Sequence, residues 1–184
     1  MTAGLRGDVR TPASCALAMT AALAAAPVAG AAPSPPTRAV DLSRYLGLWY
    51  EIARTPNRFE KGDGCEGATA DYTQDARGDM SVVQTCHKGS ANGAETVYRA
   101  SARILDPGVN ARFKLTFYLF LSKEYWVLDY AHDYQWAIVG DPSGRFLWLL
   151  SRTPTVSADT RADMLRRTQA LGYDLGQLKF PAQP

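Results

Sequence analysis

The sequence of 184 residues predicts an all-β protein, an eight-stranded up-and-down antiparallel β-barrel with one C-terminal α-helix packed outside it. Two observations predict this class. Runs of β-branched and aromatic residues recur at intervals of roughly 10–16 residues, and turn residues separate them. Near the end, the pattern changes to the spacing of an amphipathic helix. A third observation suggests a closed end: a Gly-x-Trp opens the first run, and an Arg directly follows the last one.

The breaks between the runs define the expected elements. Asn92-Gly93 is a strong hairpin signal, and Gly78 supplies the turn after the second strand. Ser157 is expected to cap a helix that runs to about Leu171 and ends at Gly172, with Met164, Leu165 and Thr168 on its apolar face. We expect strands at 47–54, 67–74, 80–87, 96–104, 111–119, 124–130, 134–140 and 146–151.

The N-terminal part is expected to direct export. Residues 1–31 are typical of a signal peptide, with two early Arg, an apolar run at 15–26 and a small-residue cleavage site at its end. A disordered Ala-rich tail is the alternative interpretation. Residues 32–39 are Pro-rich and predict a flexible linker, which leaves residues 40–184 as the barrel domain. We therefore expect a periplasmic or secreted protein, with outer-membrane association left open.

A lipid anchor is not expected. Cys15 precedes the apolar run, whereas a lipid-attachment Cys follows it, and Pro12 stands where a Leu is typical. The remaining pair, Cys65 and Cys86, favours a disulfide in an exported chain. The hairpin register places the two almost opposite each other. Metal binding is the alternative, but His87 and His132 are the only histidines to complete a site, so we expect no metal and no cofactor.

Strand alternation predicts the wall of the barrel. In the fifth run, the apolar residues alternate with Arg112, Lys114 and Thr116, so the apolar set faces inward. An eight-stranded barrel holds either packed side chains or one small ligand. Small inward residues favour a cavity, and a filled barrel is the alternative. The residues expected to line the lumen and bind a ligand are Ala70, Tyr72, Val82, Gln84, Phe113, Leu115, Phe117, Tyr125, Val127, Ala137, Val139 and Trp148.

Two charged residues are candidates for contacts with a ligand head group. Glu51 shares the inward face with Trp49, and an internal ion pair or hydrogen bond is its alternative role. Arg58 is expected near the barrel mouth, where it would pair with a carboxylate or phosphate unless it is a simple surface residue. No catalytic residue is expected, because Ser151 has no suitably placed His to activate it.

The charge and hydropathy of the chain exclude two classes of partner. The net charge of +2 is too small and too evenly spread for a nucleic-acid binder. Beyond the expected signal peptide, no segment approaches 18 apolar residues, so we expect no membrane-spanning helix. The sequence does not predict the oligomeric state.

Three segments together resemble the lipocalins. They are Gly47-x-Trp49-Tyr50, the strand at 125–128 with Asp133-Tyr134 after it, and the segment 150–154 that contains Arg152. More narrowly, WYEIAR, Arg58-Phe59-Glu60, Ala70-Asp71-Tyr72 and LWLLSRTP resemble the bacterial Blc subfamily, which is related to apolipoprotein D. The similarity covers about residues 40–183.

The resemblance implies a barrel that binds fatty acids, lysophospholipids or similar amphiphiles at the bacterial envelope, without catalysis. It also implies that Gly47, Trp49 and Arg152 are fold residues at the closed end: Gly47 for tight packing, Trp49 as a plug and Arg152 over its indole. The founding bacterial members are outer-membrane lipoproteins, and the lack of a lipid-attachment signal departs from them. Two alternatives remain, a lipid-modifying enzyme on the same barrel and an interaction module with a filled lumen.

Overall fold

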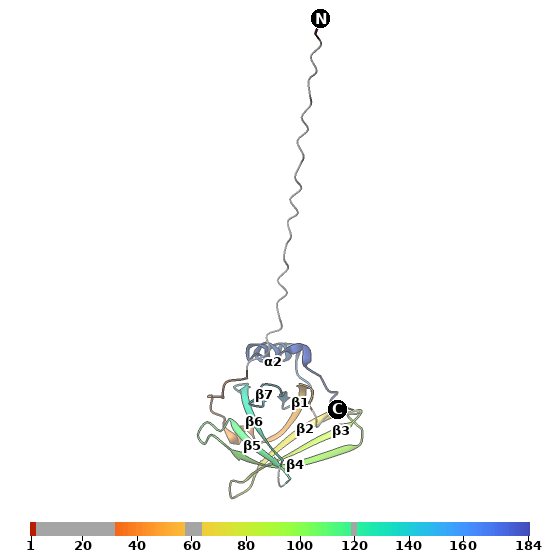
Figure 1. Cartoon of the computed structure of the whole chain (residues 1–184). Helices are drawn as coiled ribbons and strands as arrows, with labels where there is room; N and C mark the ends of the chain where they lie inside the picture. Colours follow the sequence, from red (N-terminus) through yellow and green to blue (C-terminus); the bar gives the residue numbers. More distant parts are fainter. Residues whose placement is uncertain (3–31, 58–63, 119–120) are drawn as a thin grey trace.

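The computed structural model describes residues 1–2, 32–57, 64–118 and 121–184. Eight antiparallel strands pair in chain order, and β1 also pairs with β8, so the sheet closes into a barrel (Figure 1). This confirms the predicted fold class. The strands are β1 (Gly47–Arg54), β2 (Cys65–Gln74), β3 (Met80–Lys88), β4 (Glu95–Ile104), β5 (Arg112–Phe117), β6 (Leu121–Tyr130), β7 (Trp136–Gly140) and β8 (Leu147–Ser151).

The strand limits differ from expectation by one to three residues at several ends. β6 begins at Leu121, three residues early, because it pairs with β5 as far as Phe117. The expected end of β5 at residue 119 lies outside the described residues. The sequence did not predict two short helices, α1 (Leu42–Tyr45) and the 3-10 turn η1 (Leu175–Gln177). Both are shorter than the window over which a helical period can be recognised.

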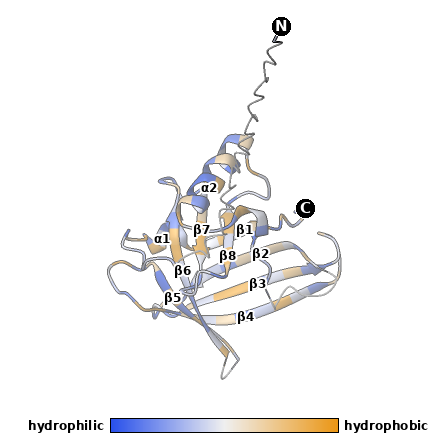
Figure 2. Ribbon diagram, turned by 45° about the horizontal axis from the view of Figure 1, so that its top comes forward, coloured by the Kyte–Doolittle hydropathy of each residue, from blue (hydrophilic) through white to orange (hydrophobic). Residues whose placement is uncertain are grey.

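The apolar residues form two separate cores. One lies inside the barrel around Tyr45 and Trp49. The other lies outside it, where the helix α2 (Ala158–Ala170) covers β1, β7 and β8; its centre includes Ile138, Leu149 and Met164. Figure 2 shows apolar and polar residues interleaved along the strands, as this two-sided burial requires.

The C-terminal helix follows the predicted design. The Ser157 hydroxyl accepts a hydrogen bond from the Thr160 amide, which caps the first turn. The helix stops before Gly172, whose φ of +91° is the left-handed conformation that ends helices. Met164 and Thr168 are fully buried, and Leu165 packs at the edge of the outer core. The helix therefore covers the barrel without entering it.

Residues ahead of the barrel are only partly described. The expected signal peptide falls almost wholly on residues 3–31, which lie outside the described residues. Residues 32–39 have no helix or strand, but Arg38 at their end contacts β6. Its guanidinium donates to the Tyr130 carbonyl at 2.8 Å and pairs with Asp129 at 3.1 Å. No helix within the described residues is long and apolar enough to cross a membrane.

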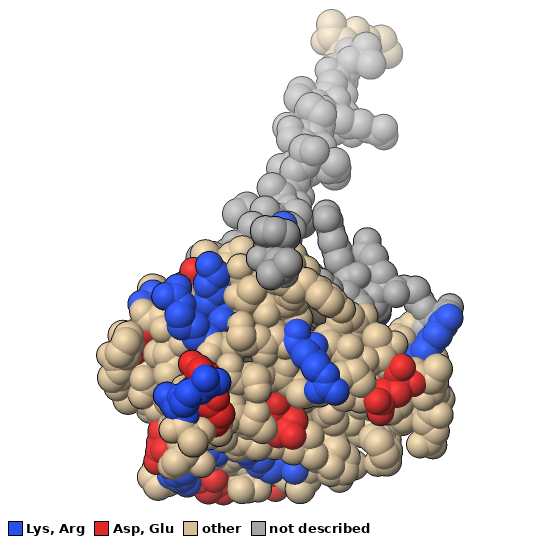
Figure 3. Space-filling view, turned by 90° about the horizontal axis from the view of Figure 1, so that it is seen from below, with Lys and Arg blue, Asp and Glu red and all other residues tan. Residues whose placement is uncertain are grey.

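The charged side chains are mixed on the face seen in Figure 3. Cations and anions alternate there instead of forming a patch of one sign. Arg167 of α2 makes two of the surface ion pairs. It contacts Asp129 of β6 and Asp163 of α2, each at 2.9 Å. Exposed pairs of this kind contribute little stability each.

Candidate ligand pocket

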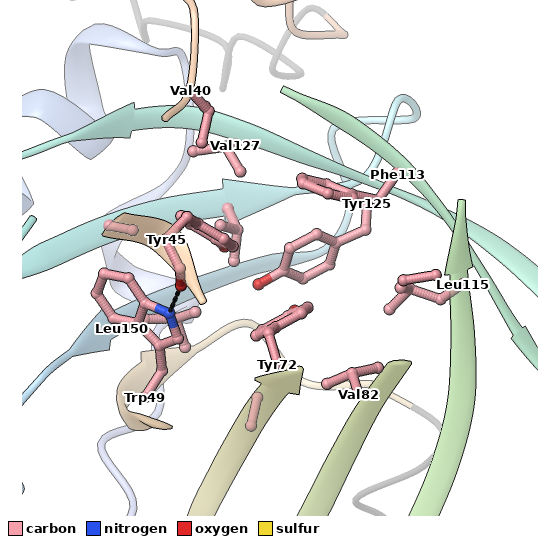
Figure 4. Close-up of a cluster of buried hydrophobic side chains, with 14 of the residues drawn as sticks. Val40, Tyr45, Trp49, Tyr72, Val82, Phe113, Leu115, Tyr125, Val127 and Leu150 are labelled. Carbon is pink, nitrogen blue, oxygen red and sulfur yellow. Dashed lines mark hydrogen bonds between the residues drawn. The ribbon is translucent and has the colours of Figure 1, made fainter. Parts of the chain in front are cut away.

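One end of the barrel is closed by Trp49 and Arg152. Trp49 is fully buried, and its indole N–H donates a hydrogen bond to the Tyr45 carbonyl at 2.8 Å (Figure 4). The Arg152 guanidinium carbon lies 3.6 Å from the centroid of the indole ring. A cation over an aromatic face in a partly desolvated place is an attractive contact. Trp49, near the start of the barrel segment, and Arg152, at its end, therefore close the same end of the barrel.

Arg152 also binds the last turn of α1. Its guanidinium donates to the carbonyls of Arg44, Tyr45 and Leu46, and to that of Leu48 in β1. These are carbonyls that a four-residue helix cannot satisfy by itself. Burial lowers the pKa of Arg152. Because arginine keeps its charge in proteins, the side chain remains a cation at the carbonyl end of the helix.

Gly47 serves this end through its backbone conformation. Its φ is +92°, a region that side chains with a Cβ rarely adopt. A Cβ at this position would lie 3.6 Å from Arg152, an ordinary contact. The tight packing expected from the sequence is therefore the wrong reason for this glycine: the turn from α1 into β1 requires the left-handed conformation.

We call the packed interior next to Trp49 the floor. Tyr45 occupies its centre, and its ring lies 5.3 Å from that of Trp49, 5.5 Å from Tyr72 and 6.0 Å from Phe113 between centroids. Most of the residues expected to line the lumen belong to this packed cluster. Those that lie in the cluster and do not line the pocket described below are Tyr72, Val82, Phe113, Leu115, Val127, Ala137 and Val139. They face inward, as alternation predicts, but other side chains already cover them.

Above the floor, the barrel contains a pocket that opens to solvent and has a cavity volume of about 150 Å³. The predicted residues that line it are Ala70, Gln84, Phe117, Tyr125, Trp148 and Glu51. Sequence reasoning missed the others, Cys65, Ala68, Thr69, Thr85, Cys86, Tyr98, Tyr118, Leu121 and Leu150. Tyr98 was detectable, because it and Ala100 alternate with the charged Arg99 in the fourth expected strand, which predicts that Tyr98 faces inward. The alternative of a barrel filled by packed side chains therefore holds for the floor but not for the pocket above it.

Glu51 forms a buried ion pair on the pocket wall. Its carboxylate accepts a hydrogen bond from the Arg54 guanidinium at 2.6 Å, and both side chains are less than a tenth exposed. A register shift between Glu51 and Ala53 lets β1 turn both charged side chains to the same side. Arg54 also donates to the Cys65 carbonyl at 2.9 Å. Glu51 thus makes the internal ion pair considered as its alternative role. Arg58 lies outside the described residues.

The C-terminal tail fills the gap between β1 and β2 beside the Glu51–Arg54 pair. The ladder between β1 and β2 ends at Tyr50 and Thr69, and the tail bonds to both strands beyond that point. Arg54 and Lys179 exchange two backbone hydrogen bonds. The Gln183 side chain donates to the Glu51 carbonyl at 2.6 Å. The tail therefore supports the wall of the pocket where the sheet is interrupted.

Cys65 and Cys86 form a disulfide on the same wall, as predicted, with 5.3 Å between their Cα atoms. The register differs from the expectation that they lie almost opposite. Cys65 pairs with Lys88, two residues beyond Cys86 on β3, and the register shifts between Glu66 and Thr69. The bridge is therefore diagonal. It fixes the start of β2, the strand that follows the segment carrying Arg58.

The chemistry that this pocket offers is mainly apolar contact. Of the groups on its wall, Tyr125 is buried, which raises the pKa of its hydroxyl well above the ordinary value and keeps it a neutral donor. Within the described residues, no group of three His, Cys, Asp or Glu side chains is close enough to hold a metal ion. Fold and site together define a ligand-binding β-barrel, closed at one end and hollow at the other.

The chain belongs to the lipocalin-like domain family, which matches residues 40–183. It is 34% identical to temperature-induced lipocalin-1 of Arabidopsis thaliana over 77% of this chain and 78% of the relative. It is 33% identical to the outer membrane lipoprotein Blc of Escherichia coli over 85% of this chain and 90% of the relative. These findings confirm the family resemblance.

Solved structures show the same fold at lower identity. Insecticyanin from the tobacco hornworm Manduca sexta superimposes with a TM-score of 0.65 at 23% sequence identity, over 84% of this chain and 87% of that one. Members of the family are typically non-catalytic binders, and membership implies that this chain binds a small hydrophobic ligand.

Proposed function

We propose that this protein binds, without catalysis, one small amphipathic lipid such as a fatty acid or a lysophospholipid, and transports or stores it in the bacterial envelope. The observation that carries the proposal is the position of the pocket. It opens at the end of the barrel opposite the Trp49–Arg152 seal, and its wall is mainly apolar. A concave site with a mainly apolar wall and a few polar groups is typical of small-molecule sites.

The binding energy requires no special residue. Burial of an acyl chain contributes about 0.8 kcal/mol per methylene. A chain with about ten buried methylenes would gain roughly 8 kcal/mol before the cost of ordering, which supports micromolar affinity. The buried Glu51–Arg54 pair adds a polar group to the wall, and with the proposed head-group role of Arg58 it would help to orient a lipid head.

The compartment is part of the proposal. The Blc relative is named an outer membrane lipoprotein, and the disulfide fits an oxidising compartment outside the cytoplasm. Residues 1–31 would act as a cleaved signal peptide, and residues 32–39 as a linker. We propose that the mature protein works in the periplasm or outside the cell without a lipid anchor, because the sequence carries no attachment signal for one.

The test is a titration of the purified mature domain with a fluorescent fatty acid, followed by displacement with a lysophospholipid and native mass spectrometry. We expect one bound ligand per chain. Gln84→Trp should block the pocket from its wall, whereas Val83→Trp, on the opposite face of the same strand, should bind normally. Absence of acyl binding to the wild type, or equal binding by the two variants, would overturn the proposal.

A further inference from the structure

Three tyrosine side chains meet where the pocket ends and the floor begins. Tyr125 comes from β6 and lines the pocket, Tyr72 comes from β2, and Tyr45 comes from α1. Ring centroids lie 6.2 Å apart for Tyr72 and Tyr125, and 5.5 Å apart for Tyr45 and Tyr72. Figure 4 shows the Tyr125 hydroxyl turned into the space beside Tyr72. We call these three residues the tyrosine cluster.

Two hydroxyls of the tyrosine cluster are buried with incomplete hydrogen bonding. The Tyr45 and Tyr72 hydroxyls lie close enough to that of Tyr125 to interact with it, but neither makes a hydrogen bond of good geometry within the described part of the chain. A buried hydroxyl that loses its bonds to water and gains none costs free energy. A core needing only apolar volume would carry Phe at these positions. The tyrosines therefore indicate that a polar atom belongs among them when the protein is occupied.

The tyrosine cluster offers neutral donors and no cation. Burial raises the pKa of Tyr45 and of Tyr72, so both hydroxyls keep their protons. Among the described residues, the guanidinium groups on the two sides of the tyrosine cluster are engaged: Arg152 binds four carbonyls beyond Trp49, and Arg54 pairs with Glu51. A carboxylate at this depth would lose its hydration without gaining a counter-ion. An uncharged oxygen is the matching acceptor.

Tyr125 connects the tyrosine cluster to the ligand. It is the cluster residue that lines the pocket, so a lipid tail that reaches the pocket's inner end would contact it first. We propose that this inner end is a subsite for an uncharged oxygen on the buried part of the ligand. The preferred ligands would be acyl lipids with a hydroxyl or carbonyl group on the chain, and Tyr125 would donate to that oxygen. The inference rests on the proposed function and narrows its ligand class.

The test compares stearic acid with a series of hydroxystearic acids that differ in the position of the hydroxyl group. Each acid displaces a fluorescent fatty acid from the wild-type mature domain. We expect one hydroxyl position to bind about tenfold more tightly than stearate, as one well-formed buried hydrogen bond allows. The measured quantity is the affinity ratio between this isomer and stearate, which cancels effects common to both ligands.

The matched variants remove one hydroxyl and keep the ring. In Tyr125→Phe the ratio should fall to about one, and an unchanged ratio would overturn the inference. Tyr72→Phe should lower the ratio less, because it removes a neighbouring hydroxyl and keeps the donor. Tyr50→Phe, on the outer face of β1, should keep the wild-type ratio. A wild type that binds stearate but shows no preference at any position would overturn the inference and leave the proposed function standing. Failure to bind every acid would overturn the proposed function itself.

Discussion

The floor and the pocket are two halves of one barrel interior, built by the same strands, and they differ in what their inward residues contact. On β3, Val82 is fully buried in the floor, whereas Gln84, two residues along on the same face, lines the pocket. On β6, Val127 belongs to the floor, and Tyr125 stands at the boundary. Alternation therefore determines which face of the sheet a residue occupies. Its position along the strand determines whether it packs in the floor or lines the pocket.

The cause of the difference is α1. This helix has four residues, and it inserts Tyr45 into the barrel, where the ring contacts Trp49, Tyr72 and Phe113. Arg152 holds the helix through its terminal carbonyls. At the opposite end, β1 and β2 separate beyond Tyr50 and Thr69, and the C-terminal tail pairs with both strands there, so no inserted ring fills that part of the interior. We expect variants in the floor to change stability and variants in the pocket to change binding.

The largest effect should come from Trp49→Ala. Removal of a fully buried indole leaves a cavity in the floor and should lower the free energy of unfolding by about 3–5 kcal/mol. Urea denaturation measures it. Trp148→Ala, on the pocket wall, should cost less stability and weaken lipid binding more. A stable Trp49→Ala protein with altered ligand preference would show that the division between the halves is wrong.

Arg54→Met tests the polar part of the pocket wall. The substitution leaves the buried Glu51 carboxylate without the Arg54 guanidinium that donates to it, which should cost roughly 3 kcal/mol of unfolding free energy. Thermal unfolding at neutral pH measures the loss. Arg99→Met, at an exposed position on β4, serves as the control and should stay within about 0.5 kcal/mol. Equal stability of the two variants would contradict a structural role for the pair.

Removal of the disulfide should have an effect of similar or slightly smaller size. The bridge joins residues separated by 21 positions, and the double variant Cys65→Ala/Cys86→Ala should lose about 3 kcal/mol through the greater entropy of its unfolded chain. Since both cysteines line the pocket, lipid affinity should fall as well. Unchanged affinity in a folded double variant would show that the start of β2 does not need the bridge to shape the pocket.

Alkaline unfolding reports on the tyrosine cluster. Above about pH 10, the phenols of the unfolded chain lose their protons, while the buried phenols, whose pKa values are raised, keep theirs. The unfolded state then binds fewer protons than the native state, so stability falls as pH rises, by about 1.4 kcal/mol per pH unit for each such tyrosine. The contribution is fully present below pH 10. Tyr72→Phe should make the decline of unfolding free energy shallower, and an unchanged slope would contradict its burial.

The sequence was sufficient to predict the barrel, the outer helix and inward residues on every strand except β4, because these follow from period and turn chemistry. The disulfide followed from an even pair of cysteines in a chain expected to be exported. It was not sufficient to predict the depth of the pocket. That depth depends on Tyr45, which lies in α1, a helix too short to show a helical period in the sequence. The register shift that turns both Glu51 and Arg54 inward is a local irregularity, and strict alternation would have placed Arg54 on the outer face.

The two halves each carry a tryptophan, which allows one direct measurement. Trp148 lines the pocket and Trp49 lies in the floor, and their indole N–H groups give separate signals in a ¹H–¹⁵N spectrum. During titration of the mature domain with stearate, the Trp148 signal should shift progressively to saturation, and the Trp49 signal should stay nearly in place. A larger shift of Trp49, or a Trp148 signal that does not move at saturating lipid, would contradict the claim that the ligand binds above a packed floor.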